Sequence, residues 1–348
     1  MKSLKSIFVK ILAPVIGLAA ILGLTSCSKA DQFTINESFT NISIDAISSD
    51  IVICPSNDGK CTVDYYGSTA MNFQAHVSDG TLKIEETKAK SIFSFLSFVK
   101  SNKITVYLPE GEYGSLMING TTGDVTVAES FTFESADLSL STGDTAFFAT
   151  VSGDTKIDAT TGDISLKCAS VGALGIDLTT GDVSITGSEV SSLNISITSG
   201  DVNIVGLSCE GDVNITLTTG EIEMSSVECE NIDVTGKTGK IVLDSVVASN
   251  NFNVKNGTGN VLFNLCDGAN IKISTTTGDI EGNLLSSKIF TTQTTTGDIE
   301  VPKTTSGGVC DLSTTTGDIY NRCISQTTRS GGCSLRRIHP RDRASSYR

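Results

Sequence analysis

The chain has 348 residues, with 33 Gly, 5 Pro, no Trp and a formal charge of −14. Residues 322–348 hold all seven Arg and one acidic residue, Asp342, so this tail carries +6 and residues 1–321 carry −20. A body this acidic repels nucleic acid and anionic lipid head groups, which argues against both as partners.

Residues 1–26 are predicted to be a lipoprotein signal peptide. Three Lys precede an apolar segment of 14 residues, 11–24, which is short for a membrane span of about 20 residues and typical of a secretory signal. The segment ends in Leu24-Thr-Ser-Cys27, which resembles the lipobox of bacterial lipoproteins. We therefore expect export and a lipid on Cys27, anchoring the protein to the outer face of the cytoplasmic membrane or to another envelope membrane. An uncleaved anchor helix is the alternative.

The body of the sequence is dominated by a Thr-Gly-Asp repeat. Eleven copies follow one another at spacings of 19 or 20 residues, counted on the glycine: Gly123, Gly143, Gly162, Gly181, Gly200, Gly220, Gly239, Gly259, Gly278, Gly297 and Gly317. Apolar residues alternate with polar ones on both sides of each triplet, as in Val213, Ile215 and Leu217 before Gly220. Alternation of period two indicates short strands with one buried face. The triplet shifts its phase, so we expect a corner there, with Gly at positive φ.

Two strands and two corners in about 19 residues make one coil, and a coil hides its apolar face only by stacking on its neighbours. The sequence therefore predicts an all-β fold, a parallel β-solenoid of about eleven coils over residues 111–321. Residues 27–110 lack the triplet but keep strand character, so irregular β coils are expected to cap the solenoid. Residues 322–348 are interpreted as out-of-frame or added sequence outside the fold, with a natural anion-binding tail as the alternative.

Ten Cys in an exported protein raise the question of disulfides. Cys54 and Cys61 flank a turn-rich hexapeptide, so a local bridge between them is the favoured candidate. Cys209 and Cys229 each lie nine residues after a repeat glycine, which predicts that they stack on adjacent coils.

The repeats, together with Asp50-Ile-Val-Ile and Leu108-Pro-Glu-Gly, resemble the putative adhesin domain family of bacterial envelope proteins, mostly uncharacterised β-solenoids. The resemblance covers residues 38–320 and is marked in residues 290–308. It implies a surface-displayed binding or adhesion module without catalytic residues. It also implies an alternative, an envelope-stress sensor or regulator whose partner is a membrane protein.

The aspartates of the triplets form the most conspicuous candidate site. If coils stack about 4.8 Å apart, neighbouring carboxylates repel by about 1 kcal/mol even in water, which a bound cation would relieve. The candidate metal ladder consists of Asp124, Asp144, Asp163, Asp182, Asp201, Asp279, Asp298 and Asp318. Each corner offers one carboxylate and Lys240 interrupts the series, so structural corner chemistry is the favoured interpretation and no cofactor is predicted.

Catalysis is not expected. The only histidines are His76 and His339, the second in the tail, and the sequence contains no HExxH, phosphate loop or paired CxxC. A polysaccharide-cleaving solenoid is the weaker alternative, and it would need aromatic and basic groups, whereas residues 1–321 contain neither Trp nor Arg. The predicted partners are the membrane, through the lipid, and an unknown surface polymer or envelope protein. Contacts are expected through outward residues of a flat face, for example Thr275, Thr294 and Thr314.

Overall fold

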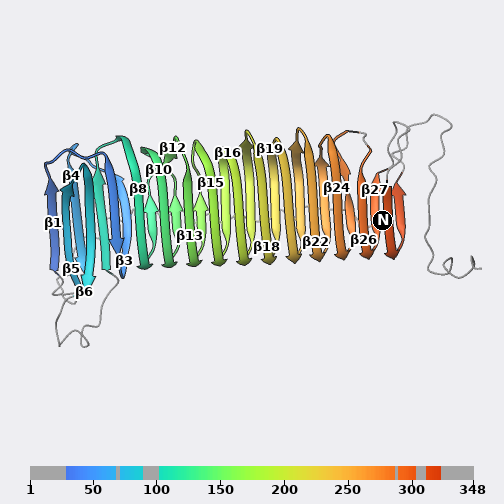
Figure 1. Ribbon diagram of the computed structural model, residues 1–348, viewed down its shortest axis with the longest axis horizontal. Coiled ribbons are helices and arrows are strands. Elements are labelled where there is room, and N and C mark those ends of the chain that lie inside the picture. Colours follow the sequence, from blue (N-terminus) through green and yellow to red (C-terminus); the bar gives the residue numbers. More distant parts are fainter. Residues whose placement is uncertain (1–28, 68–70, 89–101, 287–288, 303–310, 323–348) are drawn as a thin grey trace, which may run out of the picture.

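The computed structural model describes residues 29–67, 71–88, 102–286, 289–302 and 311–322. In these residues the chain winds into a rod of strands with its first strands at one end and its last strands at the other (Figure 1). This confirms the predicted all-β parallel solenoid. The described residues include no helix long and apolar enough to cross a membrane. Cys27 and the rest of the predicted signal peptide lie outside them, as do residues 323–348 of the tail.

One side of the rod, called the first side, is a ladder of strands that follow one another along the rod axis. In spatial order they are β5 (Met71–Ser78), β6 (Thr81–Lys88), β2 (Asn41–Ala46), β8 (Gly111–Thr122), β10 (Phe131–Thr142), β13 (Thr155–Thr161), β15 (Val171–Thr180), the second half of β16 (Val183–Ser199), β18 (Asp212–Thr219), β20 (Asn231–Thr238), β22 (Asn251–Thr258), β24 (Asn270–Thr277), β26 (Thr291–Thr296) and β28 (Asp311–Thr316).

The second side is the matching ladder across the core. Its strands are β1 (Lys29–Ile35), β4 (Cys61–Gly67), β7 (Asn102–Leu108), β3 (Ser49–Pro55), β9 (Val125–Val127), β11 (Thr145–Phe147), β14 (Ile164–Leu166), the first half of β16, β17 (Val202–Cys209), β19 (Ile222–Cys229), β21 (Ile241–Ala248), β23 (Val261–Cys266), β25 (Ile280–Leu284), β27 (Ile299–Pro302) and β29 (Ile319–Arg322). The short β12 (Thr150–Val151) pairs with β10 and β15.

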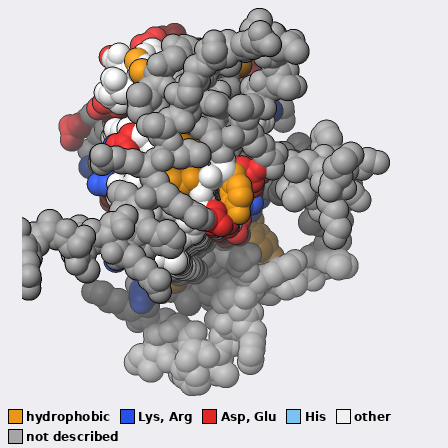
Figure 2. All heavy atoms as spheres, turned by 90° about the vertical axis from the view of Figure 1, so that its right-hand side faces the viewer, with side chains coloured by type: hydrophobic (Ala, Val, Ile, Leu, Met, Phe, Trp, Pro, Cys, Tyr) orange, Lys and Arg blue, Asp and Glu red, His pale blue; other side chains and the backbone are white. Residues whose placement is uncertain are grey.

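Among the described strands, pairing is parallel throughout the repeats, and the antiparallel pairs are those that β1, β4 and β5 form near the N-terminal end. Along each strand, buried apolar residues alternate with outward polar ones, as in β18, where Val213, Ile215 and Leu217 are buried. The buried residues of both sides form one continuous core. Toward the C-terminal end, Leu312 and Ile319 pack against that core and are half-buried, and hydrophobic and acidic side chains are visible there side by side (Figure 2).

The Thr-Gly-Asp triplet is the corner that the sequence predicted. All eleven repeat glycines have φ between +131° and +142°, a region open essentially to Gly alone. A Cβ on Gly200 would lie 1.9 Å from the carbonyl oxygen of Gly181 in the preceding coil. The Gly200 N–H donates to the carbonyl of Thr219 in the next coil at 3.0 Å. The corner backbones of successive coils are therefore in direct contact.

The chain bends again six residues after several of these glycines, within the strand of the second side. The bend residues have φ between +51° and +69°: Gly187, Gly206, Ser226, Ser245 and Leu265. A Cβ on Gly187 meets nothing within 4 Å. This bend has room for a side chain, and we call it the bend to distinguish it from the corner.

The expectation that Thr275, Thr294 and Thr314 face outward is wrong. Thr275 and Thr294 are 5% and 1% exposed, and the hydroxyls of all three donate to glycine carbonyls of the preceding corner. The third position before each repeat glycine is an inward position, which Leu217 fills in an earlier coil. Threonine can occupy this inward position because its hydroxyl donates a hydrogen bond to the corner carbonyl.

The predicted Cys54–Cys61 bridge is also wrong, because both thiols are free. Tyr107 of β7 pairs with Cys54 on one side and with Thr62 on the other, so β7 separates the two cysteines. Two strand spacings amount to about 9.6 Å, beyond the reach of a disulfide. The stacking of Cys209 on Cys229 is confirmed, since the preceding residues Ser208 and Glu228 are paired, and these thiols are free as well.

Candidate binding groove

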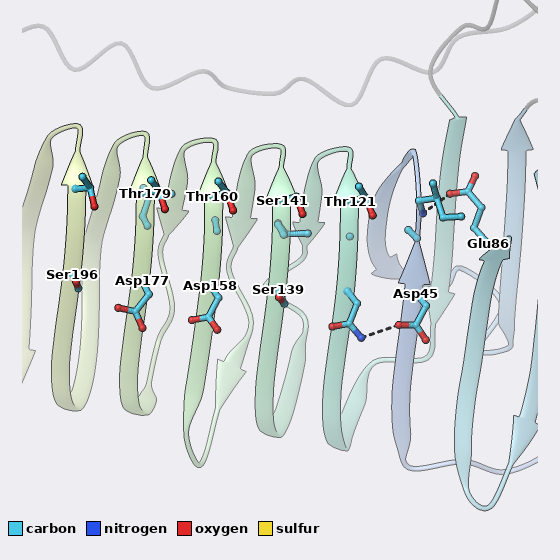
Figure 3. Close-up of a pocket in the computed structure, with 18 residues that line it drawn as sticks. Asp45, Glu86, Thr121, Ser139, Ser141, Asp158, Thr160, Asp177, Thr179 and Ser196 are labelled. Carbon is cyan, nitrogen blue, oxygen red and sulfur yellow. Dashed lines mark hydrogen bonds between the residues drawn. The ribbon is translucent and has the colours of Figure 1, made fainter. Parts of the chain in front are cut away.

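A groove with a volume of about 680 Å³ runs along the first side, across β2, β8, β10, β13, β15 and β16 (Figure 3). One wall is a row of carboxylates, hydroxyls and one amide, called the acid row: Asp45, Asn119, Ser139, Asp158, Asp177 and Ser196. The other wall is the hydroxyl row: Thr121, Ser141, Thr160, Thr179 and Thr198. The groove therefore follows the rod axis, perpendicular to the strands.

The two rows follow from the alternation of each strand. In β15, Asp177 and Thr179 point outward while Leu178 between them points into the core. Pairing repeats this arrangement from strand to strand, with Asp177 beside Asp158 and Ser196. Between the rows, the floor consists of the buried residues Ala46, Leu140, Ala159 and Leu178 and the half-buried Gly120, which has no side chain. Small floor residues between two rows of outward side chains leave the hollow.

A buried carboxylate closes one end of the groove. Glu86, on β6, is 3% exposed, and its Oε2 accepts hydrogen bonds from the N–H groups of Ile47 and Ser48 at 2.8 and 2.9 Å. Its Oε1 accepts from the hydroxyls of Ser49 and Tyr65 at 2.9 and 3.2 Å. This network fixes the turn between β2 and β3, and with it the position of Asp45.

The groove is electrostatically negative. The side chain of Lys156 lies beside Asp158, and its pKa is raised by the hydrogen bond to Asp158 and then by the charges of Asp158, Asp137 and Asp177. The Oδ1 atom of Asp158 is buried and has no hydrogen-bond partner among the described residues. At the other end of the acid row, Asn119 donates to Asp45 at 2.8 Å. A ligand of this groove therefore has to supply hydrogen-bond donors.

The same two rows change character beyond the groove. Further along the rod, Lys255 occupies the acid row in β22 and Lys237 occupies the hydroxyl row in β20, and both are exposed. The acidic, hydroxyl-lined surface is thus confined to the N-terminal half of the first side.

The corner aspartates have a structural role. In each corner aspartate that another corner follows, one carboxylate oxygen accepts a hydrogen bond from the backbone N–H of that next corner, as Asp182 does from Asp201 at 2.8 Å. Asn260 does the same for Asp279 at 2.9 Å. Asp50 starts the series by accepting from Asp124 at 3.1 Å, which makes residues 48–50 an irregular first corner without Gly. No group of three or more His, Cys, Asp or Glu suited to a metal occurs among the described residues.

The groove acids are poorly arranged for glycosidic cleavage. Asp158 and Asp177 lie side by side on one wall, whereas an acid and a nucleophile or base must flank the bond that is cleaved. His76 is exposed on the edge strand β5, which is not one of the groove strands. Burial raises the pKa of the Cys61, Cys168 and Cys229 thiols to about 12, so these thiols remain protonated and weakly nucleophilic near neutral pH.

Glu86 and Asp50 were missed from the sequence, although a signal for each exists. The alternation Leu82, Ile84, Glu86 places a carboxylate at an inward position of β6, where it needs buried partners. Ser49-Asp50-Ile51 repeats the corner pattern with Ser in place of Gly.

The chain belongs to the Toastrack DUF4097 family, whose model matches residues 39–238 and 210–328. Among solved structures, it is similar to a putative adhesin from Parabacteroides distasonis, with 13% identity, a TM-score of 0.39 and coverage of 84% of this chain and 96% of that one. It is also similar to a putative adhesin from Parabacteroides merdae, with 13% identity, a TM-score of 0.38 and coverage of 84% of this chain and 95% of that one. A putative lipid binding protein from P. distasonis has 12% identity and a TM-score of 0.35, with coverage of 84% of this chain and 97% of that one. No curated protein matches the sequence.

Proposed function

We propose that this protein is a lipid-anchored, non-catalytic binding module of the bacterial cell envelope. The observation that carries the proposal is the groove of the first side, a long polar hollow on a rigid repetitive scaffold. The outer surface of such a rod is fixed by its stacked coils, so it suits an extended partner better than a small molecule.

The anchor would place the N-terminal end of the rod next to the membrane. Cys27 precedes Lys29, the first residue of β1, by two residues, which span at most about 7 Å. On the first side the groove starts at the third strand, β2, roughly 10 Å from that end of the rod. Because the anchor would hold the groove close to the membrane, polymers of the cell's own envelope would lie within its reach.

The test has two parts. Fractionation of cells that produce the full chain should place the wild type in the membrane fraction and release Cys27→Ser, or leave it as an uncleaved precursor. The soluble Cys27→Ser protein should then be retained saturably by washed envelope material from the same bacterium, without degrading it. A Cys27→Ser protein that is cleaved normally and stays attached to the membrane would contradict the anchor. Absence of saturable retention would contradict the binding role, and turnover of the envelope material would contradict its non-catalytic character.

A further inference from the structure

We propose that the groove binds one extended polysaccharide strand that carries hydroxyl groups, with or without amino groups, and no anionic groups. The inference rests on the proposed function, because it names the ligand class of that binding module. It follows from the direction of the groove, the chemistry of its two walls and the character of its floor.

The groove has the shape of a site for a polymer. The acid row crosses six neighbouring strands, and at about 4.8 Å for each step it extends over roughly 24 Å. The same kinds of group recur at each step, so successive units of a linear chain would meet similar partners. A compact small molecule would fill only part of this length.

The walls match hydroxyl groups. Threonine and serine hydroxyls both donate and accept, whereas the carboxylates of Asp45, Asp158 and Asp177 only accept. Sugar hydroxyls can donate to the acid row and exchange hydrogen bonds in both directions with the hydroxyl row. Asp45 and Asp177 are exposed, so their carboxylates are acceptors that a sugar hydroxyl or amino group can reach. Acidic polysaccharides would be repelled by the same carboxylates.

A peptide strand fits the groove less well. Backbone recognition of a peptide needs a free sheet edge, but the groove strands are paired with neighbours on both sides. Side-chain recognition needs apolar pockets, and the floor residues Leu140, Ala159 and Leu178 are only 4%, 8% and 4% exposed. Basic peptides could still be attracted by charge alone, and the experiment below includes them.

The ligand should be held by many weak contacts. None of the described residues that line the groove is aromatic, so the stacking that anchors single sugars in many sites is missing. Affinity should therefore rise with chain length until the groove is filled. A site for a single sugar unit would show no such dependence.

The test uses the soluble full chain carrying Cys27→Ser and titrates it with oligosaccharides. The neutral probe is the hexamer of β-1,4-linked N-acetylglucosamine, the amino probe is the glucosamine hexamer, and the dimers test length. Polygalacturonate is the anionic probe and poly-L-lysine the peptide probe. Ser139→Arg fills the middle of the acid row, and its matched control is Thr216→Arg, an exposed residue of the same row beyond the groove.

We expect at least one of the two hexamers to bind at least tenfold more tightly than its dimer, with no binding of polygalacturonate. Ser139→Arg should weaken this binding at least tenfold, and Thr216→Arg should leave it within twofold. Equal effects of the two variants would overturn the groove as the site. Groove-dependent binding of poly-L-lysine without either hexamer would overturn the polysaccharide assignment.

The same variants separate this inference from the proposed function. If neither hexamer binds but washed envelopes retain the protein and Ser139→Arg abolishes retention, the binding module stands and the ligand class is wrong. If envelopes do not retain the wild-type chain either, the proposed function fails with it.

Discussion

The corner and the bend lie six residues apart in the same coil, yet they constrain the sequence very differently. At the corner, the added Cβ of any other residue would meet the backbone of the preceding coil, within 2.3 Å at each repeat glycine. At the bend, φ near +55° is unfavourable for most residues, but there is room for a side chain, and Ser226, Ser245 and Leu265 occupy this position. Gly therefore recurs at every repeat corner of this chain because the coils are in contact there. A positive φ alone does not require Gly.

The largest effect is expected from breaking one corner. Gly200→Ala combines a φ of +139° with a Cβ placed 1.9 Å from the Gly181 oxygen, so adjacent coils must separate. We expect a loss of about 4 kcal/mol in the free energy of unfolding, measured by urea denaturation.

The matched control is Gly206→Ala at the bend of the same coil. Its φ is +69° and its nearest heavy atoms lie 3.8 Å from the added Cβ, so the cost should be at most about 1 kcal/mol. Similar losses for the two variants would refute the distinction between corner and bend.

A second prediction concerns the irregular first corner, residues 48–50, which has no Gly. The side chain of Glu86, on the neighbouring strand β6, accepts hydrogen bonds there from the N–H groups of Ile47 and Ser48. Glu86→Gln removes the charge from these hydrogen bonds and places its NH₂ group either against the two backbone N–H groups or beside the Asn102 amide nitrogen, which donates to Oε1 at 3.4 Å, so we expect a loss of about 2 kcal/mol.

Glu85→Gln, on the same strand but at a half-exposed outward position, should change stability by no more than about 0.5 kcal/mol. Amide hydrogen exchange at Ile47 and Ser48 should accelerate in Glu86→Gln alone. Unchanged exchange at those two amides would show that the buried carboxylate does not hold this corner.

A third prediction separates structure from charge in the aspartate ladder. Asp182→Ala leaves the N–H of Asp201 without its side-chain acceptor and should cost about 1 kcal/mol. Asp182→Asn keeps an acceptor and removes one of the repelling charges, so its stability should equal or exceed that of the wild type, as Asn260 suggests. Both are measured by urea denaturation with and without millimolar Ca²⁺. A Ca²⁺-dependent stabilisation that Asp182→Asn abolishes would favour the metal ladder instead.

These contrasts also explain what could be read from the sequence. The corner was visible because only Gly fits it, and the strands were visible because their inward positions are apolar. The bend was invisible, since Gly206, Ser226 and Leu265 share a conformation without sharing a residue type. Thr275 and Thr294 were misplaced because a hydroxyl bonded to a corner carbonyl can replace an apolar inward residue.

The groove was not predicted, because it depends on the small floor residues Ala46, Gly120 and Ala159 coming into register. Those residues are far apart in the chain and carry no distinctive motif. The Cys54–Cys61 bridge failed for a related reason: β7, about fifty residues later in the sequence, inserts between the two strands. Proximity along the chain gave no warning of that insertion.

The smallest expected effect tests whether the bend is merely tolerant or mildly strained. Leu265 has φ +51° and a side chain that is 44% exposed, while its N–H donates to Asn283 at 2.9 Å. Asn adopts left-handed φ values more readily than Leu, so Leu265→Asn should raise the free energy of unfolding by a few tenths of a kcal/mol. The control is Leu262→Asn on the same strand, an outward residue whose φ is not positive, where Asn should be neutral or unfavourable. Urea denaturation of both variants in parallel gives the comparison. A destabilised Leu265→Asn would mean that the exposed leucine contributes packing, through its neighbour Leu285, that outweighs the backbone strain.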